Sequence, residues 1–140
     1  MRFMMMVKSN ADSEAGKLPS DELTSAVMNY NTMLAKSGVL IDLNGLHPSS
    51  KGARVKFSNG KTTVTDGPFA ETKELLGGYW IIRADSLEEA IAWARQVPFT
   101  GSPEMGEPEV EVRQIHEFED FASSEAVEQA KEIEAQMIGK

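Results

Sequence analysis

The apolar residues of the chain recur with two periods, and their order predicts strands and helices in alternation along the 140 residues. Residues 3–7 are continuously apolar, which is typical of a strand that is buried on both faces. Over residues 20–37, apolar positions return every three or four residues, which predicts a helix with Ser20 as N-cap and Gly38 as its left-handed stop. Residues 10–19 are expected to form a polar loop.

Two further helices are predicted in the second half of the chain. One starts at Ser86, which forms a capping-box pattern with Glu89, and ends at about Val97. Its inward-facing residues are expected to be Leu87, Ala90, Ile91 and Ala94. The other spans residues 123–137 and carries a thin apolar stripe on an acidic surface. Because a lone helix with so little to bury is marginal in water, we expect it to pack on a partner subunit or its own domain, or to fray.

Shorter runs between turn signals predict the other strands, at residues 39–43, 53–57, 62–65, 78–83 and 109–115. The dipeptide Asn59-Gly60 is the typical two-residue turn of a hairpin, and Val55, Phe57 and Val64 are expected on one face of it. Without this hairpin, the order of elements is βαββαβ, the ferredoxin-like order. The sequence therefore predicts an α+β fold, ferredoxin-like with an inserted β-hairpin and an extra C-terminal helix.

A sheet of this kind carries both of its helices on one face. Its other face needs a cover, and a second copy of the chain is the simplest one, so we expect a homodimer. We also expect two parts in the chain, an α+β domain over residues 1–118 and a helical extension over residues 119–140.

Composition narrows the classes of partner. The net charge is −8 at pH 7, which argues against nucleic acid, because nucleic-acid binding needs a basic surface. There is no cysteine, no apolar run long enough for a membrane helix and no recognisable signal peptide, so we expect a cytoplasmic protein that does not bind a membrane. A few local cations would still suffice to hold a small anionic ligand.

The stretch around Asp66 is the least ordinary in the chain. A strand runs into Asp66, and Gly67-Pro68 then turns the backbone sharply beside Phe69. A carboxylate beside an aromatic ring and a fixed corner can have a raised pKa and act as a general acid or base. An aspartate before Gly-Pro also commonly binds backbone amides and only fixes the turn. Both interpretations of Asp66 remain open.

Residues 64–74, with the sequence VTDGPFAETKE, and the following Leu76-Gly77-Gly78-Tyr79 resemble the signature of the DGPF proteins of the YCII-related family. Supporting similarities lie at residues 38–40, 45–48 and 111–113, and the resemblance covers roughly residues 1–118. The resemblance implies a dimeric α+β barrel of ferredoxin-like protomers, mostly from bacteria and cytoplasmic. A related enzyme of that superfamily removes chloride from a chlorinated hydroxyhydroquinone. Simpler members carry a proposed His–Asp pair in a cleft between helix and sheet.

The resemblance makes Asp66 the aspartate of such a pair. The first predicted helix contains no histidine, and the chain has two, His47 and His116. His47 can meet Asp66 if their loops come together, whereas His116 lies at the end of a strand. Asp66 and His47 are therefore the candidate catalytic residues.

Candidate substrate-binding residues lie in or near the motif. Arg54 and Lys73 could hold an anionic substrate, Phe69 could line a pocket, and Glu71 could orient the segment. Surface charge and core packing are the ordinary alternatives for these residue types. The histidines and acids lack the spacing of metal ligands, and Gly77-Gly78 is no phosphate loop, so no metal or cofactor is expected.

Two functions remain open. The first is a ligand-binding or regulatory dimer with a cleft near Asp66, in which the motif is an architectural corner; its ligand would be a small anionic or aromatic molecule. The second is an enzyme that performs acid–base chemistry, an elimination or isomerisation, on a small organic acid. The sequence favours the first, because it lacks a full catalytic set.

Overall fold

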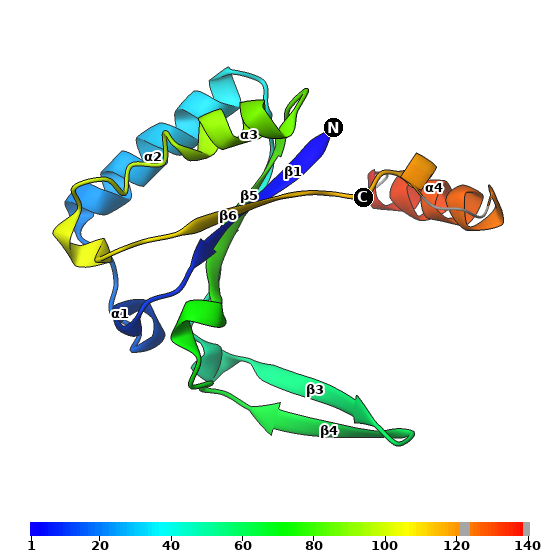
Figure 1. Cartoon of the computed structure of the whole chain (residues 1–140), viewed down its shortest axis with the longest axis horizontal. Helices are drawn as coiled ribbons and strands as arrows, with labels where there is room; N and C mark the ends of the chain where they lie inside the picture. The colour runs from blue at the N-terminus through cyan, green and yellow to red at the C-terminus, as the bar shows by residue number, and fades with distance from the viewer. Residues whose placement is uncertain (121–123, 139–140) are drawn as a thin grey trace.

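The computed structural model of the chain describes residues 1–120 and 124–138, without the side chains of Lys73, Pro103 and Ile138. Its centre is a four-stranded antiparallel sheet with the strand order β2-β5-β1-β6. The strands are β1 (Arg2–Lys8), β2 (Leu40–Gly45), β5 (Leu76–Arg83) and β6 (Val110–Gln114). Helices α2 (Asp21–Lys36) and α3 (Leu87–Ala94) cover one face of this sheet (Figure 1). This topology confirms the ferredoxin-like α+β fold predicted from the sequence.

Helix α2 begins and ends where its sequence directs. The Ser20 Oγ accepts a hydrogen bond from the backbone N–H of Leu23 at 3.1 Å, and Gly38 takes a left-handed φ of 77° just after the helix. Leu23, Tyr30 and Leu34 are its buried residues, and they follow the spacing of one helical face. The predicted helix over residues 20–37 is thereby confirmed.

The core lies between this helix layer and the sheet. Phe3, Met5, Leu34 and Ile82 are its largest fully buried side chains. The ring of Tyr30 meets that of Trp80 edge to face, with 5.4 Å between the ring centroids. The Tyr30 hydroxyl donates to the backbone carbonyl of Trp93 at 2.8 Å, and burial raises the pKa of Tyr30 to about 12. Tyr30 therefore ties α2 to α3 and to the sheet.

In the part of the chain that the structure describes, no helix packs directly on the opposite face of the sheet (Figure 1). Side chains that alternate with those of the core point to this open face, and Met4, Met6 and Ile81 form its apolar centre. Met6 is already buried in the single chain, whereas Met4 and Ile81 are half-buried. Polar pairs flank that centre. The Tyr79 hydroxyl donates to Asp42 at 3.1 Å, and Lys8 forms an ion pair with Glu111 at 3.3 Å.

Strands β3 (Ala53–Ser58) and β4 (Lys61–Asp66) form a separate hairpin that projects from the domain (Figure 1). Asn59 and Gly60 both have positive φ, 52° and 73°, which confirms the predicted two-residue turn. Val55 pairs with Val64, so the predicted apolar face forms. Every residue of the hairpin is exposed in the single chain.

Several local predictions were wrong. The expected loop before α2 contains a short helix, α1 (Ala11–Glu14), because Asn10 and Ser13 form a reciprocal capping box. Helix α3 ends at Ala94, not at Val97. The backbone N–H groups of Gln96 and Val97 donate to carbonyls three residues earlier, which tightens the chain before Pro98. The described residues also form four short 3₁₀ turns, η1 (Ser49–Lys51), η2 (Thr72–Glu74), η3 (Pro103–Met105) and η4 (Phe118–Asp120).

The inward face of α3 was also only partly predicted. Ala90 is buried and Ala94 is half-buried, but Leu87 and Ile91 are exposed. Both line an open groove of about 830 Å³ between α3 and β6. They miss the core because α3 packs beside the edge strand β6, where no further strand lies beneath them.

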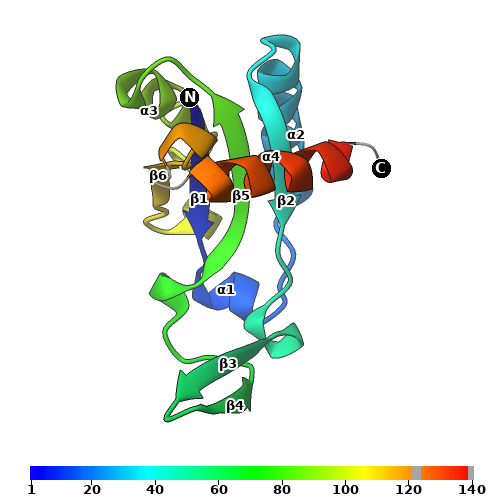
Figure 2. The ribbon, with the colours of Figure 1, turned by 90° about the vertical axis from the view of Figure 1, so that its right-hand side faces the viewer.

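Helix α4 (Ser124–Ile138) follows η4 and makes its main contacts with that turn. It stands off from the open face of the sheet in Figure 1 and crosses in front of the strands in Figure 2. Each residue from Lys131 to Met137 is exposed. The predicted helix is confirmed over its described part, while Ser123 lies outside the described residues.

Candidate functional site

A cleft of about 800 Å³ lies between the first half of α2 and the sheet, at the end where β1 and β2 finish and β5 begins. Its walls come from α1, α2, the loop after β2 and the loop that contains η3. Pockets that hold small ligands usually have volumes of about 300–1,000 Å³. This cleft is therefore large enough for a small organic molecule.

Two glycines form part of the floor of the cleft. On the helix side of the sheet, Leu43, Trp80 and Met5 form one complete row across the strands. In the next such row, Gly45 pairs with Gly78, and Gly78 pairs with Val7. Two adjacent strands thus offer bare backbone where α2 passes over them.

The walls of the cleft are mostly apolar. Leu23, Val27 and Met28 of α2 contribute to one side, and Trp80 lies at the inner end. The Trp80 indole N–H donates to Asn31 Oδ1 at 2.7 Å, which fixes the Asn31 amide beside the cavity. The cleft therefore combines an apolar body with one oriented amide, a combination that binds and orients small ligands.

Charged residues gather at the mouth. His47 and Lys51 line it from the segment after β2, and both are exposed. Lys17 also lines it and forms an ion pair with Asp12 at 3.7 Å. The mouth thus offers an imidazole and two ammonium groups, one of which already faces a carboxylate.

Glu104 closes one end of the cleft by binding the start of α2. The backbone N–H of Ser20 donates to Glu104 Oε2 at 3.0 Å, and the Ser20 hydroxyl donates to Oε1. The hydrogen bonds from the Ser20 side chain and backbone, helped by the nearby Lys17, lower the pKa of Glu104. These two hydrogen bonds join the loop of η3 to the start of α2 beside the cleft.

The Asp66–Pro68 corner supports the other wall. A Cβ atom on Gly67 would lie 1.7 Å from the carbonyl oxygen of Ser49, so only glycine fits there. The backbone N–H of Phe69 donates to Ser49 Oγ at 2.9 Å, and the Ser49 hydroxyl donates to Glu14. The corner is thereby joined through Ser49 to α1 and to the segment that carries His47.

The predicted catalytic residues occupy different positions. His47 lines the cleft, whereas Asp66 lies exposed at the end of β4, opposite Ala53, and lines neither the cleft nor the α3–β6 groove. The two residues thus lie in different parts of the described structure, His47 at the mouth of the cleft and Asp66 at the end of β4. In this single chain the carboxylate therefore does not point into the described cleft, and the catalytic role of both residues stays a prediction.

Three of the predicted substrate-binding residues do come together, but outside the cleft. The Arg54 guanidinium lies 3.9 Å above the ring centre of Phe69 and forms an ion pair with Glu71 at 3.6 Å. In the single chain these groups interact with one another at the base of the hairpin. The side chain of Lys73, the fourth of these residues, lies outside the described part of the structure.

Several residues that shape the cleft were not predicted from the sequence, namely Gly45, Gly78, Asn31, Ser49 and Glu104. A signal for the first two was present, because glycine inside a strand often marks a close approach of backbone or ligand. No comparable signal exists for Asn31, Ser49 and Glu104, whose partners lie far away in the sequence.

The family model for the YCII-related domain matches residues 1–119. An uncharacterised protein of Rhizobium meliloti (strain 1021) is 43% identical over 74 residues, which are 50% of this chain and 60% of that relative. The chain therefore matches only about three fifths of the length of that protein.

Among solved structures, the chain is similar to 5-chloro-2-hydroxyhydroquinone dehydrochlorinase from Burkholderia phenoliruptrix in complex with 2,5-dihydroxybenzoquinone. The TM-score is 0.46 at 17% sequence identity, over 83% of this chain and 94% of that one. None of the described helices combines the length and the apolar character that crossing a bilayer requires.

Proposed function

The chain belongs to the YCII-related domain family, and from this premise we propose that it is a ligand-binding module whose site is the cleft between α2 and the glycine floor of the sheet. The observation that carries the proposal is the cleft of about 800 Å³ that lies over the paired Gly45 and Gly78, where two adjacent strands present bare backbone. Protein interiors are close-packed, so an open hollow of this size is unusual. Beside the hydrogen-bonded side chains of Trp80 and Asn31, it is typical of a site that binds a small ligand.

The lining suggests the class of ligand. Leu23, Val27 and Trp80 favour a flat apolar body such as an aromatic ring. Asn31 can hydrogen-bond a polar substituent at the inner end, and His47 and Lys51 can hold an anionic group at the mouth. We therefore propose a small aromatic carboxylate or a related organic anion as the ligand class.

The proposal includes a homodimer that is formed by two open sheet faces. Met4, Met6 and Ile81 lie in the centre of that face, and ion pairs and hydrogen bonds surround them. An apolar centre with a polar rim is the usual anatomy of a protein–protein interface. The motif at residues 66–68 then has an architectural role, since it holds the wall of the cleft in place.

Thermal shift with a panel of aromatic acids tests the site; benzoate, the hydroxybenzoates and phenylacetate are suitable probes. We expect at least one of them to raise the melting temperature of the wild type, because a ligand that binds only the folded state stabilises it. Gly45→Val should abolish that shift. A Cβ at Gly45 meets nothing within 4 Å, so the variant should fold while its side chain blocks the floor of the cleft, where the ligand would lie.

Asp66→Asn is the matched control for this test. Because Asp66 does not line the cleft, the variant should keep the full ligand-induced shift. A shift that survives in Gly45→Val would contradict the proposed site, as would the absence of any shift across the panel. A shift that disappears only in Asp66→Asn would instead favour a site at the corner.

An enzyme remains the second candidate, and the position of His47 at the cleft favours it. An imidazole at the mouth could take a proton from a ligand whose body lies between α2 and the sheet. Turnover of a panel compound that is lost in His47→Gln, while the thermal shift persists, would support this function. Turnover that is unchanged in His47→Gln would remove the histidine from the mechanism.

A further inference from the structure

We propose that α4 of one chain packs on the apolar face of the β3–β4 hairpin of a second copy. In a symmetric dimer this contact forms twice, once at each end of the sheet. The proposal rests on the homodimer of the proposed function and adds a contact formed by a helix outside the region that the family model matches. Two observations carry it: two projecting elements with unsatisfied apolar faces, and their opposite charge.

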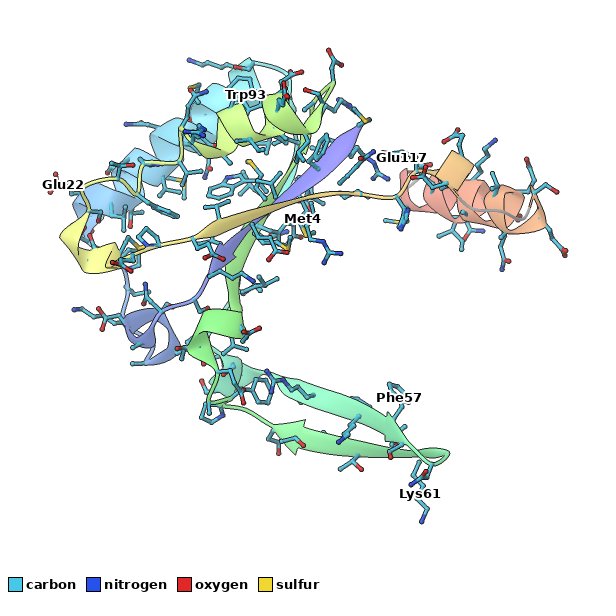
Figure 3. The ribbon with its side chains drawn as sticks, in the orientation of Figure 1. Met4, Glu22, Phe57, Lys61, Trp93 and Glu117 are labelled. Atoms are coloured by element: carbon cyan, nitrogen blue, oxygen red, sulfur yellow. The ribbon has the colours of Figure 1, made fainter. Side chains whose placement is uncertain are left out.

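The hairpin exposes a continuous apolar face. Phe57 is 79% exposed, and Val55 and Val64, which pair across the two strands, are 52% and 63% exposed. Figure 3 shows Phe57 pointing from the hairpin toward the side on which α4 lies, whereas Lys61 points away. A two-stranded hairpin is at best marginally stable in water without something to pack against. This face therefore needs a partner.

Helix α4 also exposes apolar side chains that no other element covers in the single chain. Ile133 is 51% exposed and Met137 is 69% exposed, four residues apart on one side of the helix. The helix has 15 residues, a length at which isolated helices are marginal in water. Its main contacts are with the turn η4, which leaves this apolar side uncovered in the single chain.

The two elements lie on the same side of the sheet but at opposite ends of its strands (Figure 1). The hairpin follows the end of β2, where Gly45 is level with Val7, and α4 follows β6, whose Gln114 is level with Phe3. A chain therefore cannot close α4 onto its own hairpin without spanning the open face. A second copy turned end over end against that face brings its hairpin to α4, and the symmetry forms the contact twice.

The charges of the two elements favour a contact between the hairpin and α4 over a contact between two hairpins or two copies of α4. Residues 53–65 of the hairpin contain three basic and no acidic side chains, and residues 124–138 contain four acidic side chains and one basic. Two hairpins side by side would repel each other, and so would two copies of α4. A hairpin against α4 joins opposite charges around the two apolar faces, which fixes the end-over-end arrangement.

Disulfide cross-linking tests the contact in the full chain, which has no native cysteine. Phe57→Cys in one tagged chain and Ile133→Cys in a second, differently tagged chain are mixed and mildly oxidised. We expect a covalent species that carries both tags, and no cross-link when either variant is oxidised alone. Lys36→Cys, exposed at the end of α2, replaces Phe57→Cys as the matched control and should give no cross-link.

Other outcomes overturn the proposal in distinguishable ways. A cross-link within one chain that carries both substitutions would place α4 on its own hairpin. Cross-links between two copies of the same variant would indicate the opposite orientation of the dimer. No cross-link in a chain that light scattering shows to be dimeric would contradict this contact alone, while a monomeric wild type would contradict the dimer as well.

A truncation after Asp120 gives an independent measurement. Removal of α4 should raise the dimer dissociation constant about tenfold or more, because each apolar side chain buried in the interface contributes measurably to affinity. Phe57→Ser should weaken the dimer in the same direction, and the two changes together should not add. An unchanged dissociation constant in both variants would overturn the proposal.

Discussion

At the scale of single residues, Gly67 decides how the Asp66–Pro68 corner sits against the cleft. Its Cα approaches the Ser49 carbonyl so closely that an added Cβ would lie 1.7 Å from that oxygen. We expect Gly67→Ala to lower the free energy of unfolding by about 1–3 kcal/mol, the usual cost of forcing a group into a filled space. Urea denaturation of the two proteins measures the change.

Gly52→Ala is the control for this substitution, because its Cβ would approach the same Ser49 oxygen at an ordinary 3.5 Å. Its backbone is extended, with a φ of −129°, so alanine fits without strain. We expect a change within about 0.5 kcal/mol for this variant. Equal effects of the two substitutions would show that the close approach at Gly67 does not matter.

Contacts of single residues were the features least predictable from the sequence. The motif directed attention to the carboxylate of Asp66, but the surrounding structure depends on the missing side chain of Gly67 and on the Ser49 hydroxyl. Gly45 and Gly78 lie together on the floor of the cleft because the strand register sets them opposite each other. Register between distant strands depends on the packing of the whole sheet, so a single sequence does not reveal it.

At the scale of elements, the bond between Glu104 and Ser20 joins the η3 loop to the start of α2. The pKa of Glu104 is lower in the folded protein than its ordinary value of 4.5. Between the lowered pKa of the folded protein and 4.5, the unfolded chain binds more protons than the folded one. The contribution of Glu104 to stability is therefore complete above about pH 4.5. It is lost as the pH falls through the lowered value.

Glu104→Gln should therefore be less stable than the wild type at neutral pH, and the two proteins should converge in acid. Melting temperatures from pH 7 to pH 3 measure this difference. Glu107→Gln changes an exposed carboxylate of the same loop and should follow the wild type throughout. A difference between Glu104→Gln and the wild type that stays constant with pH would mean that the carboxylate does not carry the contact.

The elements themselves were largely predictable from the sequence. Helix α2 and the hairpin follow local signals: the caps at Ser20 and Gly38, and the turn at Asn59-Gly60. Burial of the hairpin's apolar face was not predictable in the same way. The hairpin alternates like a half-buried strand, yet it is fully exposed in one chain, because alternation identifies a face and not what covers that face.

At the scale of the whole molecule, the proposed dimer depends on the open sheet face. Ile81 lies there, between Trp80 and Ile82, whose side chains point into the core. Its side chain therefore points away from the core, and a charge at this position should leave the fold intact. In a dimer of two open faces the same charge would be buried without a partner, which costs several kcal/mol.

If the proposed dimer forms through this face, Ile81→Glu should give a folded monomer, measured by light scattering and circular dichroism. Leu87→Glu is the matched control, since Leu87 is an exposed apolar residue on the helix side of the sheet and should not affect the mass. If α4 and the hairpin alone held the copies together, Ile81→Glu would remain dimeric while the truncation after Asp120 dissociated. Retention of the dimer in both variants would place the interface elsewhere, because neither the open face nor the α4–hairpin contact would then be needed for association.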